Sequence, residues 1–519
     1  MNRTKKFLTD GMIVAICAVF MRTVVVMWNG YVSKIVGAEA MGLLSLVMSV
    51  YGFAVTFALS GIGLGVTRCV SEAISVLDYG RAKGALCASL LYAVFFGTIA
   101  SVTVFTFSEF ISVNLLCDMR CIKGVRIFSL SMLPLSVSAV FGGYFNAVRR
   151  VYKSAAASIS EQFVRMGACV LLFSLFLSDG VEGAVVSIVL GSTVAECFSC
   201  LMSAMLCAFD VILHNKGKNQ GKFIVSEGKK VCLISLPIAL STYLRSALTT
   251  VEHILIPRCL RKNGLEQGAA LSAYGMLGSM VIPLVLYPAS LTASFASLLV
   301  PELSGAKAKG EWGHIKRAAA KAIYTTLAFS TFVSVVMMCY GGEFGRVMYN
   351  SQEAGYYIKL LSPIIPIMYL DTVVDSMLKG LGYQVYTMVV NIIDATISVI
   401  GVLIFIPSLG ILGYVVLITV SEIINAGASM FKLVKVVKLD LSVVKLVVIP
   451  VSFSVLSCMI VRFVFSAVTY VSDETAKGLF VHITAALGVY LIMTKIAIDI
   501  LSHLKNEKIS VQKRADPSF

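Results

Sequence analysis

Residues 67–84 read TRCVSEAISVLDYGRAKG, and residues 300–317 read VPELSGAKAKGEWGHIKR. At an offset of 233 residues, identical or chemically similar residues meet at these positions: Ser71 with Ser304, Ala73 with Ala306, Asp78 with Glu311, Gly80 with Gly313, and Lys83 with Lys316. Further matches follow in the same order in both halves: Pro134 with Pro366, Gly180 and Gly183 with Gly410 and Gly413, and Glu196 with Glu422. This internal similarity indicates two copies of one structural unit.

The composition indicates that lipid surrounds most of the chain. Of its 519 residues, 58% are hydrophobic and only 14% are charged, whereas soluble domains carry about 25% charged residues. A chain of this length cannot bury so much apolar surface in cores of ordinary size. We therefore predict an all-α polytopic membrane protein and exclude a water-soluble one.

Apolar stretches of about 20 residues, the length that crosses a bilayer core, predict fourteen transmembrane helices. They cover residues 10–32, 43–66, 85–107, 127–147, 155–177, 184–208, 231–256, 271–299, 318–340, 358–378, 384–406, 412–434, 446–470 and 478–501. The first stretch is too long for a removable signal peptide, and no small-residue cleavage site follows it. We expect it to remain as a transmembrane helix.

The basic residues predict how the chain is oriented in the cell membrane. There are 43 Lys and Arg against 28 Asp and Glu, which gives a formal net charge of +15. Twenty-eight of the basic residues fall on the side of the termini and ten fall on the opposite side. Because cytoplasmic loops are enriched in Lys and Arg, we expect both termini to be cytoplasmic. The basic excess then reflects topology, and no nucleic-acid partner is expected.

The repeat divides the predicted helices into two equivalent sets. Helices 1–6 form an N-lobe at residues 1–208, helices 7–12 form a C-lobe at residues 231–434, and residues 209–230 form a cytoplasmic linker. Because each copy has an even number of helices, both copies enter the membrane from the same side. Two pseudo-symmetric six-helix lobes around a central cleft have the geometry of alternating access. Residues 435–519 add two C-terminal helices and a cytoplasmic tail.

Three strings carry a family resemblance. Residues 282–318 read IPLVLYPASLTASFASLLVPELSGAKAKGEWGHIKRA, residues 142–167 read GGYFNAVRRVYKSAAASISEQFVRMG, and residues 255–260 read LIPRCL. They resemble the stage V sporulation protein B family, a branch of the multidrug/oligosaccharidyl-lipid/polysaccharide exporter superfamily. That superfamily also contains the lipid II flippases and the multidrug and toxin extrusion antiporters. The resemblance covers nearly the whole chain and implies flipping of a lipid-linked saccharide, a peptidoglycan precursor similar to lipid II.

Charged residues inside spans are candidate site residues, because a charge at a helix centre costs at least about 2.5–3.5 kcal/mol on insertion scales. Arg22 and Arg245 occupy corresponding places in the first and seventh spans. Two guanidinium groups at similar depth can bind a diphosphate, and the resemblance implies that an Arg at the place of Arg22 lines the cavity. In the alternative, Glu252, two turns from Arg245 on the same face, neutralises it. Arg68 and Glu252 complete the candidate substrate-binding set.

Glu161 and Arg165 in the fifth span are a candidate gate or lobe contact. The acid precedes the base by four residues, which is the favourable order for an intrahelical ion pair. The alternative to a contact between lobes is therefore a pair satisfied within its own helix. Glu196 and Glu422, equivalent in the repeat, are interpreted as structural residues.

Asp371, Asp375 and Asp394 are candidate ion-coupling residues. Asp371 and Asp375 share one face of the tenth span, and Asp394 lies in the eleventh. Two carboxylates in a poorly hydrated site cannot both ionise cheaply, which suits the binding of a proton or a monovalent cation such as sodium. In the alternative, Lys379 at the next turn and a hydrated cleft satisfy them.

No sequence pattern indicates a cofactor, a metal site or catalysis. The glycines at 61, 63 and 65 are not followed by the Gly-Lys-[Ser/Thr] of a phosphate loop. Cys197 and Cys200 have no histidine partners for zinc, and the 13 cysteines are interpreted mainly as small core residues. His253 in the seventh span is interpreted as a packed side chain. We therefore expect no enzyme activity, no cofactor and no metal.

Three functional hypotheses follow. The leading one is a membrane transporter that flips a lipid-linked oligosaccharide outward by alternating access, in cell-wall or spore-cortex synthesis. Its expected partners are the lipid-linked saccharide, the lipid bilayer, and a proton or monovalent cation. The first alternative is a cation-coupled multidrug or small-molecule antiporter of the same fold. The second is a non-transporting membrane scaffold, against which the charges of Arg22 and Arg245 argue.

Overall fold

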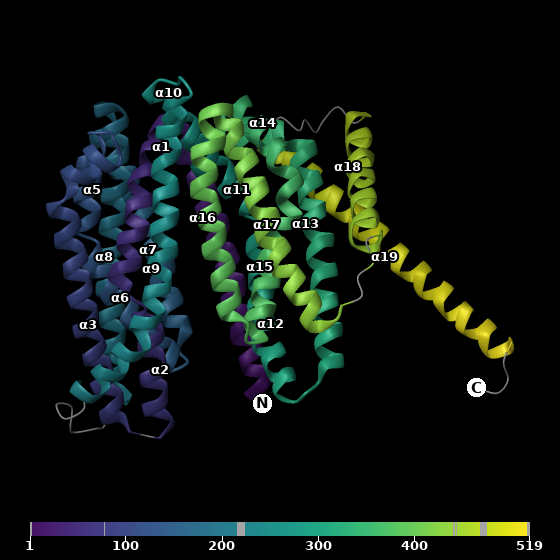
Figure 1. The fold of residues 1–519 in the computed structure, drawn as a ribbon, viewed down its shortest axis with the longest axis horizontal. Helices are drawn as coiled ribbons and strands as arrows, with labels where there is room; N and C mark the ends of the chain where they lie inside the picture. The colour runs from purple at the N-terminus through teal and green to yellow at the C-terminus, as the bar shows by residue number, and fades with distance from the viewer. Residues whose placement is uncertain are drawn as a thin grey trace. The chain divides into compact units, whose positions relative to one another are not determined.

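The structure is a computed structural model that describes residues 3–76, 78–214, 224–439, 442, 444–467 and 475–515. Helices are the only regular elements in these ranges, and no strand occurs in them (Figure 1). The chain divides into two compact units. Unit 1 comprises Met1–Pro283 and Met388–Ser421, and unit 2 comprises Leu284–Thr387 and Glu422–Phe519.

Unit 1 begins with α1, a helix of 57 residues at Arg3–Leu59. At about 1.5 Å per residue α1 is much longer than the roughly 30 Å of a bilayer core, and its helical geometry is interrupted at Gly37, where φ is 79°. A glycine tolerates this positive φ because it has no Cβ. The break lies between the first and second predicted spans, and α1 ends at Leu59, before the predicted end of the second span at residue 66.

The other elements of unit 1 continue in chain order. They are α2 (Ile62–Ser75), α3 (Tyr79–Thr106), α4 (Ser108–Phe110), η1 (Ile111–Leu115), α5 (Cys121–Ser129), α6 (Met132–Ala147), α7 (Val151–Phe176), η2 (Leu177–Asp179), α8 (Gly180–His214), α9 (Ile224–Lys262), α10 (Gln267–Gly275), η4 (Met276–Val281) and most of α16 (Gln384–Leu409). Helix α1 lies beside α9 and α10 (Figure 1). Elements of both sequence repeats therefore meet inside unit 1.

Unit 2 is built mainly from the second half of the chain. Its elements are α12 (Ala289–Ala308), α13 (Trp312–Tyr349), α14 (Gln352–Leu361), η5 (Ser362–Ile364), α15 (Ile365–Gly380), most of α17 (Ile411–Val437), η6 (Val444–Val448), α18 (Ile449–Ala467) and α19 (Ala476–Ala515). The short helix α11 (Ile282–Leu286) joins the two units. One buried apolar cluster connects α12, α13, α15 and α17, and a second connects α13 to α18 and α19.

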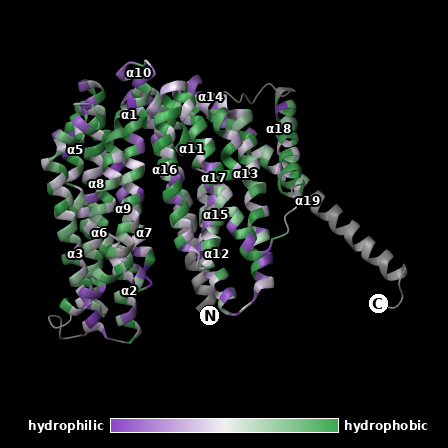
Figure 2. Ribbon diagram, viewed as in Figure 1, coloured by the Kyte–Doolittle hydropathy of each residue, from purple (hydrophilic) through white to green (hydrophobic). Residues whose placement is uncertain are grey.

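The helices agree with a multi-pass membrane protein. Within the described residues, ten helical stretches are long and apolar enough to cross a membrane, or eleven if the bent pair Cys121–Ser129 and Met132–Ala147 counts as one span. Two of the ten, Phe20–Ser75 and Val151–Asp210, have 56 and 60 residues, more than twice the roughly 20 residues of one span. Hydrophilic residues concentrate near helix ends, as at α2 and α10 (Figure 2). The count of fourteen spans remains a prediction.

The two units do not coincide with the two sequence repeats. Helices α9, α10 and most of α16 belong to unit 1, although their residues lie in the second repeat. Helical structure also enters the predicted linker from both sides, because α8 continues to His214 and α9 begins at Ile224. The remaining linker residues, 215–223, lie outside the described residues. The division into two lobes around a cleft stays a prediction.

Candidate functional site

A pocket of about 340 Å³ surrounds Arg22 in unit 1. It is lined by the first part of α1, by α7 and by the start of α11, through Met21, Arg22, Val25, Val26, Asn29, Ser158, Gln162 and Pro283. Arg22 is exposed, and no carboxylate among the described residues forms an ion pair with it. A guanidinium beside the amides of Asn29 and Gln162 offers several hydrogen-bond donors to one anionic group. The structure therefore places Arg22 as a candidate anion ligand.

A second pocket in unit 1, of about 350 Å³, has a different character. It is formed by the second part of α1, by α9, and by α10 with η4, through Ser45, Met48, Ser49, Gly52, Ser246, Thr249, Thr250, His253, Tyr274 and Gly278. None of these lining residues is Asp, Glu, Lys or Arg. The pocket is therefore suited to uncharged polar groups. Sequence reasoning missed it, because scattered Ser and Thr in an apolar chain form no motif.

Arg245 interacts with a different acid from the one that the sequence suggested. Arg245 is exposed on α9, and no ion pair within the described residues joins it to Glu252. The charge of Arg245 instead interacts with the Asp394 carboxylate on α16. The Glu252 carboxylate also interacts electrostatically with Asp394. Ser421 Oγ donates a hydrogen bond to Asp394. The structure thus groups Arg245, Glu252 and Asp394 from two helices, and Arg245 does not line the Arg22 pocket.

Asp371 and Asp375 lie in unit 2 and have polar neighbours on α17. Asn425 Nδ2 donates to Asp371 at 3.4 Å, and Ser429 Oγ donates to Asp375 at 3.1 Å. Lys379 Nζ lies 3.8 Å from the Asp375 carboxylate, as the alternative interpretation expected. Asp394 belongs to unit 1. The three candidate ion-coupling aspartates are therefore divided between the two units.

Glu161 and Arg165 form the intrahelical pair, with 2.7 Å between Oε1 and Nη2. Arg165 is also within electrostatic reach of Glu196 on α8, a buried residue that accepts a hydrogen bond from the Tyr51 hydroxyl on α1. These contacts connect α1, α7 and α8 inside unit 1. They favour a structural role for the pair, and a gate role stays a prediction.

Arg68 is not part of either pocket. Its Nε lies 3.0 Å from Glu72 on the same helix, and the two side chains are 67% and 51% exposed. An exposed pair at i, i+4 contributes at most about 0.5 kcal/mol. Nothing in these contacts distinguishes Arg68 from an ordinary surface residue.

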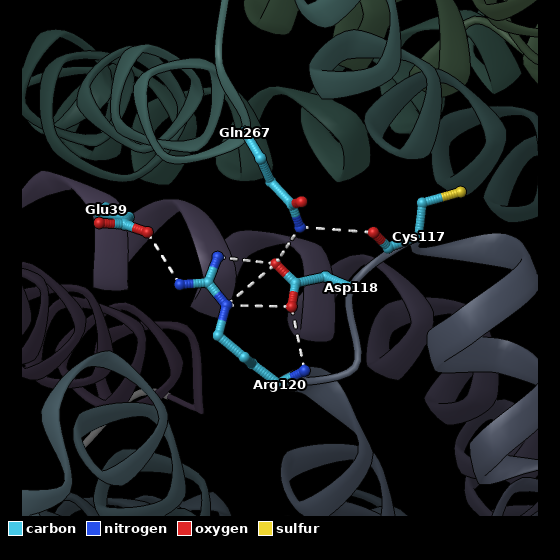
Figure 3. A network of polar contacts seen from close by, with 5 residues as sticks. All are labelled: Glu39, Cys117, Asp118, Arg120 and Gln267. Atoms are coloured by element: carbon cyan, nitrogen blue, oxygen red, sulfur yellow. Dashed lines mark hydrogen bonds and ion pairs between the residues drawn. The ribbon is translucent and has the colours of Figure 1, made fainter.

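A polar network at one end of unit 1 was also missed by the sequence reasoning (Figure 3). Arg120 binds Asp118 through two nitrogens and reaches Glu39 with Nη1 at 2.8 Å. Gln267 Nε2, at the start of α10, donates to Asp118 at 2.8 Å. Burial opposes ionisation of Asp118, but the hydrogen bonds from Arg120 and Gln267 outweigh it and hold the pKa of Asp118 below its usual value. The network joins three segments that are distant in the sequence, so no local pattern predicts it.

The backbones of α1 and α10 touch beside this network. A Cβ built on Gly42 would lie 1.9 Å from the carbonyl oxygen of Leu271, and one built on Gly275 would lie 2.2 Å from the nitrogen of Gly42. Only glycines permit this approach, because any side chain would overlap the facing backbone. The second pocket begins about one turn further along both helices, at Ser45 and Gly278. The crossing therefore lies about one turn from that pocket.

Among the described residues, no group of three His, Cys, Asp or Glu is placed to hold a metal ion. One pocket presents a guanidinium and the other presents hydroxyl and imidazole groups. Both are arrangements for reversible binding of a polar ligand.

Two family models match the chain. One, described as polysaccharide biosynthesis protein, covers residues 8–306, which is more than half of the chain. The other, MatE, covers residues 263–404.

Curated relatives match over most of their length. The chain is 24% identical over 474 residues to stage V sporulation protein B of Bacillus subtilis (strain 168), which covers 89% of this chain and 90% of that protein. It is 21% identical over 391 residues to sporulation protein YkvU of the same organism, covering 74% and 84% of the two chains.

Solved structures share the fold. The lipid II flippase MurJ in an inward closed conformation superposes with a TM-score of 0.69 at 14% identity, covering 94% of this chain and 99% of that chain. An inward-facing multidrug resistance transporter of the MATE family superposes with a TM-score of 0.62 at 15% identity, covering 82% and 98%.

Proposed function

Because the chain belongs to the polysaccharide biosynthesis protein family, we propose that it flips a lipid-linked oligosaccharide across the cell membrane. The substrate class is a peptidoglycan precursor similar to lipid II, used in cell-wall or spore-cortex synthesis. The relative named stage V sporulation protein B and the fold shared with a lipid II flippase support this proposal. The protein moves its substrate by alternating access, without covalent chemistry.

The observation that carries the proposal is the guanidinium of Arg22, which lies in a pocket of its own and has no ion-pair partner within the part of the chain that the structure describes. A lipid-linked saccharide has a diphosphate between its sugar and its lipid. A guanidinium offers a planar donor fork to phosphate oxygens, and Asn29 and Gln162 add amide donors on the same pocket wall. The sugar enters the polar interior while the lipid tail stays in the bilayer.

The energy for export comes mainly from the charge of the substrate. Moving one negative charge outward across a membrane that is negative inside is favoured by about 2.3 kcal/mol per 100 mV. A proton or sodium ion then serves the return of the empty transporter, and its candidate ligands are Asp394 in unit 1 and Asp371 and Asp375 in unit 2. Both termini lie in the cytoplasm in this proposal.

A second candidate function is a cation-coupled multidrug antiporter. The observation that favours it is the acidic group of Glu252 and Asp394 on α9 and α16, together with the MatE match over residues 263–404. Two neighbouring carboxylates suit a cationic drug or a coupling ion better than a diphosphate.

Reconstitution into proteoliposomes distinguishes the two functions. Fluorescent lipid II and a cationic dye are supplied in parallel, and the fraction of each that crosses the membrane is measured. The flippase proposal expects transport of lipid II, with loss of transport in Arg22→Ala and partial retention in Arg22→Lys. Transport of the dye alone would establish the antiporter instead.

A matched control separates loss of a ligand from loss of the fold. Arg126 pairs at 2.6 Å with Glu109 on an exposed surface, so Arg126→Ala removes the same charge away from both pockets. We expect Arg126→Ala to flip lipid II at the wild-type rate. Equal loss in the two variants would mean that Arg22 acts only through net charge or stability.

A further inference from the structure

The second pocket of unit 1 differs from the Arg22 pocket in the chemistry of its walls. Its polar groups are the hydroxyls of Ser45, Ser49, Ser246, Thr249 and Thr250 and the paired side chains of His253 and Tyr274. Among the described residues that line it, none carries a permanent charge. Its volume of about 350 Å³ lies within the range of about 300–1,000 Å³ that is typical of small-ligand pockets.

The Tyr274 hydroxyl fixes the proton position on His253. Tyr274 is 1% exposed, and its hydroxyl lies 3.0 Å from His253 Nδ1. A buried phenol needs an acceptor for its proton, so the Tyr274 O–H donates to Nδ1. A neutral imidazole then carries its own proton on Nε2. His253 therefore offers the pocket one N–H donor of defined position.

The hydroxyl groups supply acceptors. Ser49 Oγ donates its proton to the Leu46 carbonyl at 2.7 Å, and Thr250 Oγ1 donates its proton to the Ser49 carbonyl at 3.0 Å. Each oxygen retains lone pairs after this donation. Because both protons are committed to the backbone, these oxygens act as acceptors toward a ligand. The pocket thus combines fixed acceptors with the His253 donor.

We propose that this pocket is the saccharide subsite of the transporter. Sugar hydroxyls donate and accept hydrogen bonds and carry no charge, which matches a wall of hydroxyl acceptors and one imidazole N–H. The proposal rests on the proposed function and deepens it, because it assigns the sugar to the His253 pocket and the diphosphate to Arg22. His253 then acts in substrate selection.

Gly52 lines the pocket and leaves room for the first atom of a side chain. A Cβ built on Gly52 meets no atom within 4 Å, so Gly52→Leu adds a bulky apolar side chain at the pocket wall without a clash at its Cβ. Gly167 on α7 is also helical and exposed, and its Cβ position is equally open. Gly167 lines neither pocket, so Gly167→Leu is the matched control. His253→Phe removes the donor at similar volume.

The test compares two lipids that share the diphosphate and the lipid tail and differ in the sugar-bearing headgroup. Binding of lipid II and of undecaprenyl diphosphate, which has no saccharide, is measured on the purified full-length protein in lipid nanodiscs. Loss of about 1.4 kcal/mol of hydrogen bonding corresponds to about a tenfold loss of affinity. We expect Gly52→Leu and His253→Phe each to weaken lipid II binding about tenfold and to leave undecaprenyl diphosphate binding unchanged. Arg22→Ala should weaken binding of both lipids.

The outcomes separate failure of the subsite from failure of the function. Unchanged lipid II binding in Gly52→Leu, or equal weakening for both lipids, would overturn the saccharide subsite while leaving the flippase intact. Failure of the wild-type protein to bind either lipid would overturn the proposed function itself. The thermal unfolding midpoint of Gly52→Leu should match that of Gly167→Leu, which shows that pocket filling does not unfold the protein.

Discussion

Gly42 of α1 and Gly275 of α10 cross so closely that a Cβ on Gly275 would lie 2.2 Å from the Gly42 nitrogen. The two helices come from different copies of the sequence repeat. Their contact and the Arg120 network beside it lie at one end of unit 1, next to the pocket that contains His253.

The first prediction concerns this crossing. Gly275→Ala places a methyl group against the α1 backbone, and overpacking of this kind costs about 1–3 kcal/mol. We expect a lower thermal unfolding midpoint and increased accessibility of a cysteine placed at Ser45 to a water-soluble maleimide. Gly167→Ala, where the Cβ meets no neighbour, should change neither quantity. Identical behaviour of the two variants would show that the crossing tolerates a side chain.

The second prediction concerns pH and the Asp118 network. Because the pKa of Asp118 is lowered in the folded protein, its stabilisation is complete above the unfolded value of about 3.9 and is lost as pH falls through the folded value. Asp118→Asn should cost about 1–3 kcal/mol at neutral pH. The difference in unfolding midpoint between wild type and Asp118→Asn should stay constant from pH 7 to about pH 5 and shrink below about pH 4. A difference that disappears between pH 6 and pH 7 would implicate another group.

The third prediction concerns the coupling ion. Asp394 accepts a hydrogen bond from Ser421 and lies within electrostatic reach of both Arg245 and a second carboxylate, Glu252, whereas the Lys379 ammonium lies 3.8 Å from Asp375, beside the Ser429 hydroxyl. A carboxylate that has a second carboxylate beside it gains more from a bound cation than one that already has an ammonium beside it. Asp394→Asn should therefore shift the pH or sodium dependence of flipping more than Asp375→Asn does, with substrate binding retained in both. A transport rate that is independent of pH and sodium in the wild type would remove the need for either site.

The fourth prediction concerns the driving force. If the substrate carries its negative charge outward, each 100 mV of membrane potential contributes about 2.3 kcal/mol per charge. Collapsing the potential with an ionophore in proteoliposomes should slow lipid II flipping and lower the final outward fraction. Full activity in de-energised vesicles would instead describe a downhill scramblase.

The fifth prediction concerns how α18 is held in unit 2. Arg462 Nη2 lies 2.8 Å from Glu343 on α13, and the guanidinium lies 4.9 Å from the centre of the Tyr340 ring. Arg462→Ala leaves the buried Glu343 carboxylate without this charge, which should cost about 1–3 kcal/mol. Arg68→Ala, which breaks an exposed pair, should cost at most about 0.5 kcal/mol. Thermal unfolding of the purified variants measures the loss of stability in each. Equal losses would contradict a stabilising role of the Arg462–Glu343 ion pair.

Sequence alone determined the class of this protein. Its apolar stretches require lipid, and they can cross lipid only as helices because every backbone hydrogen bond must be made within the segment. The fold shared with solved transporters and the family membership agree with that prediction. The charges within spans also selected Arg22, because an arginine in an apolar helix is costly unless it faces a polar space.

Tertiary structure alone decided which side chains meet. Arg245 neighbours Asp394 instead of pairing with Glu252, and His253 is oriented by Tyr274 in a hydroxyl-lined pocket instead of being simply packed. Lipid tails are as apolar as a protein interior, so hydropathy periodicity does not indicate which face of a membrane helix points inward. The rotation of each helix about its axis is set by close contacts such as that of Gly42 with Gly275, and these join residues far apart in the sequence.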